Sequence, residues 1–336
     1  MDRTGDHPLR AGGMSDMLIE AIHGEYRECR IPGLVRTGHG TLLGYYECRD
    51  STSDWARIDL KIIRSTDGGE SWETVLLIPG EGHTLNNPVM IVDGETMHFL
   101  YCRDYKELFY RRSSDDGVSF SETRDITHVF RAHGFYNAAA VGPGHGIVHK
   151  GDLIVAAWFS ENHDDPMAHR PTKLRTVYSP DGGETWILGG VVGRYDLKDP
   201  NESALALLPD NRVLISIRHR NLKRKCRVFG YSETGRADWY SVHYRDDIPD
   251  PVCMGSMTSA EDGTMFHINC AAKKTRTNLT LRVSEDGFAT YRDILVDEIA
   301  GYSDVAVDAQ TKTAYILYER DADNGGLYFK KLNYAE

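Results

Sequence analysis

The sequence predicts an all-β fold, a six-bladed β-propeller, and three observations lead to that prediction. A short segment occurs five times along the chain, at steps of 48, 66, 53 and 52 residues. Each copy follows a strand-like alternating run, and a second short apolar run usually comes after it. No run longer than a turn or two has the periodicity of an amphipathic helix. A repeat of about 50 residues is typical of solenoids, propellers and arrays.

The repeated segment is predicted to be a fixed turn between two strands. Residues 65–72 (Ser-Thr-Asp-Gly-Gly-Glu-Ser-Trp) and 179–186 (Ser-Pro-Asp-Gly-Gly-Glu-Thr-Trp) are nearly identical. Residues 113–120 have Phe in place of Trp, residues 284–291 keep Ser-x-Asp, and residues 232–239 keep only Ser and Trp. The Ser hydroxyl and Asp carboxylate can bind backbone N–H groups of the turn, while Gly supplies an unusual backbone angle. Ordinary Asp-Gly hairpins would not place five such segments in one register.

Five copies indicate five blades, and a sixth blade is expected without a copy. The expected blades cover residues 28–79, 87–128, 140–191, 202–244, 254–297 and 302–334, the last with an N-terminal strand near 19–29 that closes the ring. Such sheets around a central channel leave only short edges. A five-bladed propeller and a β-sandwich are the alternatives, although sandwiches lack a repeat of this length.

Composition fits one large domain and argues against a polyanionic partner. We expect a poorly ordered arm over residues 1–24 and a single domain over residues 25–336, because all-β domains often reach this size. The net charge of −11 argues against nucleic acid or an anionic membrane as the partner. It does not argue against an anionic small substrate, since a pocket can be locally basic.

The expected location is the cytoplasm. Residues 1–16 lack the apolar core of a signal peptide, and no apolar stretch approaches the roughly 20 residues that cross a bilayer. The six cysteines have no C-x-x-C spacing and are expected to be reduced and mostly buried. A chain that had lost its leader would look the same and would be secreted.

Three arginines stand at strand ends in three different blades. Arg30 opens the first blade, Arg218 ends a strand of the fourth, and Arg276 opens a strand of the fifth. Three guanidinium groups that point at one spot would suit a carboxylate, which they bind in a bidentate, permanently charged fork. Any one of them alone could be an ordinary surface arginine.

Short motifs follow one another in a fixed order over residues 29–320. They are Arg30-Ile31-Pro32, Glu47-Cys48-Arg49, Ser53-Asp54, Asn87-Pro88, the Gly-Pro-Gly-His-Gly-Ile run at 142–147, Asn201-Glu202-Ser203, Cys253-Met254-Gly255-Ser256 and Tyr302-Ser303-Asp304. Together with the Asp-box (BNR) repeats, this series resembles the exo-sialidase (neuraminidase) family.

The resemblance implies a role for each matched residue. Arg30, Arg218 and Arg276 would bind the substrate carboxylate, Arg49 would be an accessory arginine, Asp54 the general acid and then base, Tyr302 the nucleophile, and Glu202 its base. Tyrosine nucleophiles set sialidases apart from most glycosidases. Met254 stands where the family often has Gln near the glycerol tail and N-acyl group. Met254 is expected to be an accessory substrate contact. Because its side chain is apolar, a preference of the protein for N-acetylneuraminate is in question.

The implied chemistry suits a sugar with a carboxylate on its anomeric carbon. A carboxylate nucleophile would meet a repulsion of about 4 kcal/mol at 4 Å for an effective dielectric constant near 20. A neutral phenol avoids this repulsion, but its pKa of about 10 requires a base such as Glu202. Asp54 must be protonated to assist the leaving group.

The expected function is retaining hydrolysis of a terminal α-linked sialic acid or related ulosonic acid through a covalent tyrosyl–glycosyl intermediate. The expected partner is a small-molecule or glycan substrate with an anomeric carboxylate, and no cofactor, metal, nucleic acid or membrane is expected. The alternatives are a silent propeller that binds acidic sugars, and a lyase or transglycosylase on the same scaffold.

Ordinary explanations exist for the same residues. Asp54 could be a plain loop residue, Tyr302 a core tyrosine with a satisfied hydroxyl, and Glu202 a turn residue. The basic tract 218–225 lacks the aromatic residues of a nucleic-acid site, and residues 161–169 are expected to be a polar loop rather than a metal site.

Overall fold

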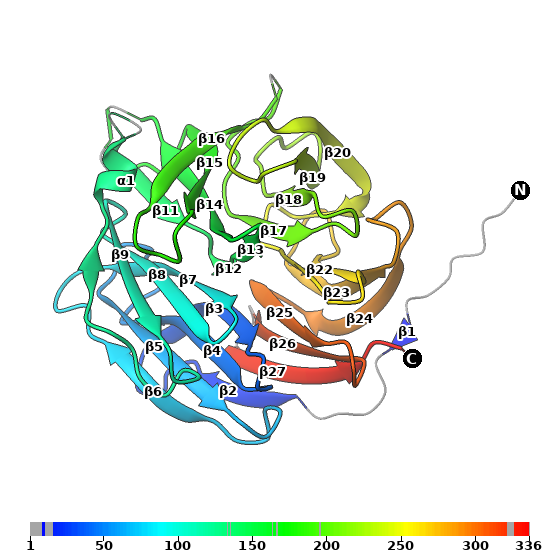
Figure 1. Cartoon of the computed structure of the whole chain (residues 1–336), viewed down its shortest axis with the longest axis horizontal. Coiled ribbons are helices and arrows are strands. Elements are labelled where there is room, and N and C mark those ends of the chain that lie inside the picture. Colours follow the sequence, from blue (N-terminus) through cyan, green and yellow to red (C-terminus); the bar gives the residue numbers. More distant parts are fainter. Residues whose placement is uncertain are drawn as a thin grey trace, which may run out of the picture.

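Six β-sheets stand around a central axis in the computed structural model (Figure 1). The structure describes residues 9–10, 16–132, 134, 136–162, 164–165, 167–194, 196–320 and 326–335. Within these residues the only helix is the four-residue α1 (His128–Arg131). The six-bladed propeller predicted from the repeats is therefore confirmed, and the five-bladed and sandwich alternatives are wrong.

The blades follow one another in chain order. Blade 1 is β3 (Glu28–Arg36), β4 (Leu42–Arg49), β5 (Ile58–Ser65) and β6 (Glu73–Ile78). Blade 2 is β7 (Leu85–Asp93), β8 (Thr96–Arg103), β9 (Glu107–Ser113) and β10 (Arg124–Asp125), with β12 (Gly144–His145) parallel to β7. Blade 3 is β11 (Ala138–Val141), β13 (Ile147–His149), β14 (Asp152–Ser160), β15 (Thr172–Ser179) and β16 (Ile187–Val192).

The second half of the ring is built in the same way. Blade 4 is β17 (Ser203–Leu207), β18 (Val213–Ile217), β19 (Cys226–Ser232) and β20 (Tyr240–Pro249). Blade 5 is β21 (Ser256–Ser259), β22 (Met265–Cys270), β23 (Thr277–Ser284) and β24 (Arg292–Ile299), with β1 (Leu9–Arg10) parallel to β24. Blade 6 is β25 (Ser303–Asp308), β26 (Thr313–Arg320), β27 (Gly326–Asn333) and β2 (Met17–Ala21).

Strand β2 closes the ring. It pairs antiparallel with β27, with Met17 opposite Phe329 and Ala21 opposite Gly326. This strand lies inside the segment 1–24 that was expected to be an arm, and it begins two residues before the expected 19–29. Residues 1–8 and 11–15 of that segment lie outside the described part of the chain.

The repeated segments are the turns between the third and fourth strands of their blades. In blade 1 the Gly69 N–H donates to Ser65 Oγ at 2.9 Å, and the Ser71 N–H donates to Asp67 Oδ1 at 3.0 Å. Equivalent bonds occur in the turns at 113–119, 179–185 and 284–290. The Trp72 ring packs edge-on at 5.2 Å against Phe329 of blade 6. The turn thus fixes its own backbone, as the sequence predicted, and its aromatic ring packs against the neighbouring blade.

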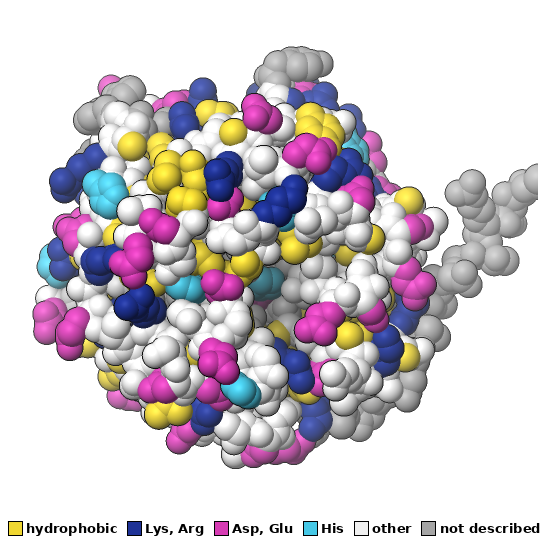
Figure 2. Space-filling model, in the orientation of Figure 1, with side chains coloured by type: hydrophobic (Ala, Val, Ile, Leu, Met, Phe, Trp, Pro, Cys, Tyr) yellow, Lys and Arg dark blue, Asp and Glu magenta, His cyan; other side chains and the backbone are white. Residues whose placement is uncertain are grey.

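Apolar side chains fill the space between the blades. One buried cluster joins blades 2 and 3, and another joins blades 5 and 6. All six cysteines are buried and unpaired, as predicted. No helix in the described part of the chain is long and apolar enough to cross a membrane. Acidic and basic side chains are interspersed over the face shown in Figure 2, around a central hollow.

Candidate active site

A polar cavity of about 280 Å³ opens where the inner strands of the propeller begin. Its lining residues are Arg30, Ile31, Arg49, Asp54, Asn87, Tyr105, Trp158, His169, Arg170, Asn201, Glu202, Arg218, Arg220, Arg276 and Tyr302. Some stand at the start of an inner strand, and others come from the connection between the second and third strands of a blade. Both kinds of position lie on one face of a propeller, so residues far apart in sequence meet there.

Three arginines surround one tyrosine ring in this cavity. The guanidinium carbons of Arg30, Arg218 and Arg276 lie 5.3, 5.8 and 5.2 Å from the ring centroid of Tyr302. They come from blades 1, 4 and 5, and the tyrosine immediately precedes β25 of blade 6. The structure thus brings together the predicted carboxylate-binding arginines and the predicted nucleophile.

Tyr302 is hydrogen-bonded to Glu202. The phenolic hydroxyl donates to Glu202 Oε1 at 2.7 Å and lies 2.8 Å from Oε2. Arg218 Nη1 donates to the same hydroxyl at 2.6 Å and also forms an ion pair with Glu202. Burial holds the pKa of Tyr302 well above its usual range; Arg218 opposes this shift and Glu202 adds to it. The phenol is therefore neutral and has a carboxylate in contact to accept its proton.

Asp54 is held by Arg49. Arg49 Nη1 donates to Asp54 Oδ1 at 2.9 Å, while Arg49 Nε donates to the buried Glu47 Oε2 at 2.8 Å. Burial tends to raise the pKa of the Asp54 carboxyl, but Arg49, with smaller effects of Arg30 and His169, brings it below its usual value. The Arg49 side chain is 1 % exposed and that of Asp54 is 51 % exposed. The Asp54 carboxylate is therefore accessible to a ligand.

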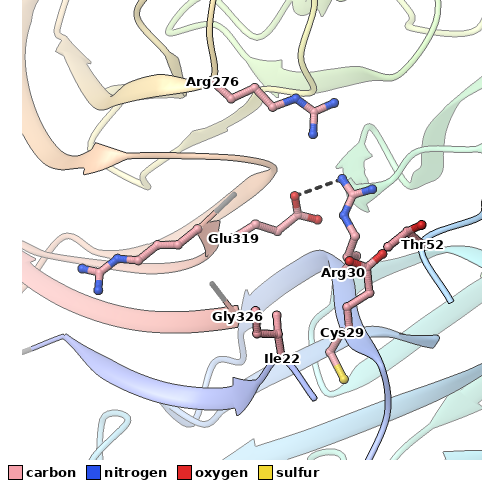
Figure 3. A pocket seen from close by; sticks show the side chains of 9 residues that line it. Ile22, Cys29, Arg30, Thr52, Arg276, Glu319 and Gly326 are labelled. Atoms are coloured by element: carbon pink, nitrogen blue, oxygen red, sulfur yellow. Dashed lines mark hydrogen bonds and ion pairs between the residues drawn. The ribbon is translucent and has the colours of Figure 1, made fainter. Parts of the chain in front are cut away.

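Glu319 is a site residue that sequence reasoning missed. Its carboxylate accepts the backbone N–H of Ile31 at 2.8 Å and that of Tyr302 at 3.0 Å, and it pairs with Arg30 at 3.1 Å. It thereby fixes an arginine and the tyrosine relative to each other. Figure 3 shows the ends of Arg30 and Arg276 converging beside this carboxylate, in an adjoining cavity of about 320 Å³. The available signal was a lone acid in the apolar run 313–320.

Two further groups of lining residues were not predicted. Tyr105, Trp158 and His169 form an aromatic wall, with the His169 ring 4.5 Å from Tyr105 and 5.4 Å from Trp158. Arg170 and Arg220 add positive charge to the cavity. Arg220 belongs to the basic tract 218–225, and Arg170 follows the polar segment 161–169.

Met254 does not line the cavity. It is 1 % exposed and packs in the apolar cluster that also contains Ile31 and Tyr302. Its side chain therefore lies behind the site. In the segment 161–169, His163 lies outside the described residues, and the residues that are described hold no group of three metal-ligating side chains.

Known proteins resemble this chain over most of its length. The family model of the BNR repeat-like domain matches residues 73–313. A sialidase of Bacteroides fragilis (strain YCH46) is 27 % identical over 337 residues, which cover 86 % of this chain and 59 % of that protein. An exo-alpha-sialidase of Arthroderma benhamiae is 26 % identical over 308 residues, which cover 78 % of this chain and 68 % of that protein.

The fold is also shared with solved structures. The Hadza microbial sialidase Hz136 superimposes with a TM-score of 0.81 at 23 % identity, over 95 % of this chain and 68 % of that one. The chain spans less than two thirds of the length of the Bacteroides relative.

Proposed function

This chain belongs to the family of BNR repeat-like domains, and from that premise we propose that it is a retaining exo-glycosidase of sialidase type. It would hydrolyse a terminal α-linked sialic acid or related ulosonic acid through a covalent tyrosyl–glycosyl intermediate. The observation that carries the proposal is the convergence of Arg30, Arg218 and Arg276 on Tyr302, whose hydroxyl is bound to Glu202.

The first half-reaction transfers the sugar to the enzyme. The substrate carboxylate binds the three arginines, which holds the anomeric carbon beside the Tyr302 oxygen. As the Tyr302 oxygen bonds to that carbon, its proton passes to Glu202. The bond from the anomeric carbon to the leaving oxygen breaks, and Asp54 gives that oxygen its proton.

The second half-reaction releases the sugar. Asp54, now ionised, removes a proton from water, and the water oxygen bonds to the anomeric carbon on the face that the leaving group vacated. The bond to Tyr302 breaks, and Glu202 returns its proton to the phenolate. Two displacements retain the configuration of the anomeric carbon, and all groups return to their starting states.

Charge explains why a neutral tyrosine would replace a carboxylate as nucleophile. A substrate carboxylate held by the arginines would repel a second negative charge at the same carbon by about 4 kcal/mol at 4 Å, for an effective dielectric constant near 20. The raised pKa of Tyr302 keeps the phenol neutral until Glu202 takes the proton during attack. The relatives named sialidase support this assignment.

Fluorogenic ketosides test the proposal. We expect release of 4-methylumbelliferone from at least one of the α-ketosides of N-acetylneuraminate, ketodeoxynononate and ketodeoxyoctonate, with the α-anomer of the free sugar appearing first by NMR. Tight binding of the sugars without turnover would instead indicate a silent binding propeller. Transfer of the sugar to an added acceptor would indicate a transglycosylase.

A further inference from the structure

Six arginines line the cavity, and the proposed reaction uses four of them. Arg30 pairs with Glu319, Arg218 with Glu202, and Arg49 with Glu47 and Asp54. Arg276 lies over Tyr302 together with Arg30 and Arg218, and these three form the arginine triad of the site. This leaves Arg170, which follows β14, and Arg220, which follows β18, without a part in the chemistry.

Hydrogen bonds connect the stretch next to Arg170 with the stretch next to Arg220 through residues 198–200. The Arg220 N–H donates to the Lys198 carbonyl at 2.8 Å. Next to Arg170, the Thr172 hydroxyl donates to the Pro200 carbonyl at 2.7 Å, and the Glu161 N–H donates to the Pro171 carbonyl at 2.8 Å. Residues 198–200 are therefore bonded to both stretches, which holds Arg170 and Arg220 on the same side of the cavity.

Arg170 is exposed to water, and Arg220 is partly buried. Within the described residues, no Asp or Glu side chain forms an ion pair with either of them. Burial lowers the pKa of Arg220, and the neighbouring charges of Arg170 and Arg218 lower it further, against a smaller opposing effect of Asp199. Arg218 differs: burial tends to lower its pKa, but Glu202 and Tyr302, with a smaller effect of Cys253, together raise it. Asp199 acts on Arg220 but forms no ion pair with it. Neighbouring cations that no carboxylate pairs with favour an anion.

The position of this pair relative to the triad indicates which part of a ligand it meets. Arg30, Arg218 and Arg276 belong to blades 1, 4 and 5, and Tyr302 belongs to blade 6. The part of the cavity that remains is lined from blades 2 and 3, by the aromatic wall and Arg170, and Arg220 stands beside Arg218 at the edge of that part. A sugar anchored through its carboxylate would extend toward the aromatic wall and toward Arg170 and Arg220. These arginines would then face the ring or tail substituents that are remote from the anomeric carbon.

We propose that Arg170 and Arg220 form a second anion-binding subsite, which selects ulosonic acids that carry a sulfate, phosphate or carboxylate group on the ring or tail in addition to the anomeric carboxylate. The inference rests on the function proposed above. Guanidinium groups bind such oxyanions in bidentate fashion, and a dianionic sugar would place one charge on the triad and the other on this pair.

A matched pair of substrates tests the subsite. We expect kcat/KM for the 4-methylumbelliferyl α-ketoside of N-acetylneuraminate 9-phosphate to exceed that of the unphosphorylated ketoside about tenfold or more, the scale of one charge-assisted hydrogen bond. The ratio should fall as sodium chloride is raised. It should approach one in Arg170→Gln and Arg220→Gln and recover in part in Arg220→Lys. Arg224→Gln, which removes a surface arginine paired with Asp246 at 2.6 Å, should keep the wild-type ratio.

A binding measurement separates this inference from the catalytic one. The 2-deoxy-2,3-didehydro analogues of the same two sugars need no turnover, so calorimetry reads the subsite even in a protein that cleaves neither ketoside. Equal affinity of the wild-type protein for the two analogues would overturn the subsite. So would an unchanged preference in both glutamine variants.

Discussion

The phenolic hydroxyl of Tyr302 donates to the carboxylate of Glu202 at 2.7 Å, although the two residues are 100 positions apart and stand in blades 6 and 4. The pair is buried, and Arg218 contacts both members. A buried phenol beside a carboxylate is hard to ionise in the resting protein. The same contact gives its proton a place to go when a new bond forms at the oxygen.

Replacing the tyrosine tests whether this oxygen is the nucleophile. Tyr302→Phe keeps the ring that the three arginines surround but removes the oxygen. We expect kcat to fall by at least about 10²-fold, the scale of one catalytic group. Tyr315→Phe, on β26 and stacked on Phe329, should leave kcat unchanged. Near wild-type turnover of the Tyr302 variant would reject the assignment, as would mass spectrometry of a 2,3-difluoro sugar adduct that located the label elsewhere.

Substitution of one triad arginine tests the carboxylate site. Arg276→Lys keeps the charge and loses the planar fork, which we expect to raise KM about 10- to 100-fold with a smaller effect on kcat. Steady-state kinetics with a methylumbelliferyl ketoside would separate the two constants. Arg224→Lys on the surface is the control and should change neither. An unchanged KM in the Arg276 variant would mean that the substrate carboxylate binds elsewhere.

The proposed acid role of Asp54 predicts that activity is highest at acid pH. It must be protonated to act on the leaving group, and Arg49 holds its pKa in the free protein below the usual value of about 3.9. The protonated fraction therefore falls tenfold for each pH unit above that pKa. We expect kcat/KM for an alkyl ketoside to decline from acid toward neutral pH with a limiting slope of −1.

The pKa of the Asp54 carboxyl should be higher in the substrate complex than in the free protein. A substrate that covers Asp54 and brings its own negative charge raises the pKa of this carboxyl, so the same decline in kcat should appear at higher pH. Asp54→Asn should remove the dependence in both profiles. A kcat/KM that stays flat between pH 4 and 7 in the wild-type protein would contradict the acid role.

The sequence predicted the fold and most of the charged site because both leave local signals. The turn at 65–72 repeats its hydrogen-bonding residues at fixed spacing, which marks the blades and their order. The motifs around Arg30 and Tyr302 occur in family order, and the family model and the relatives confirm that resemblance. The Asp of the repeated turn and the arginines of the site are recognised by their residue type, which can be read directly from the sequence.

Residues that act through tertiary position were not predictable in this way. Glu319 looks like one acid in an apolar strand, and its contacts to Ile31 and Tyr302 exist only after blades 1 and 6 meet. Met254 matched a motif position, yet its side chain packs in the apolar cluster behind the cavity and does not line it. Arg170 lies in a stretch whose only sequence signal was polarity.

Two neighbouring glycines allow a test of ring closure. Gly68 and Gly69 have φ values of +72° and +90°, which alanine adopts only with strain of about 1–2 kcal/mol. A Cβ on Gly68 would meet nothing within 4 Å, whereas one on Gly69 would lie 2.1 Å from the Phe329 ring of blade 6. We therefore expect Gly69→Ala to lower the free energy of unfolding by about 1–3 kcal/mol more than Gly68→Ala, measured by urea denaturation. Adding Phe329→Leu should narrow that difference, because the smaller side chain relieves the clash. Equal losses in the two alanine variants would mean that the first turn does not press on the last blade, and that β2 and β27 hold the ring closed without it.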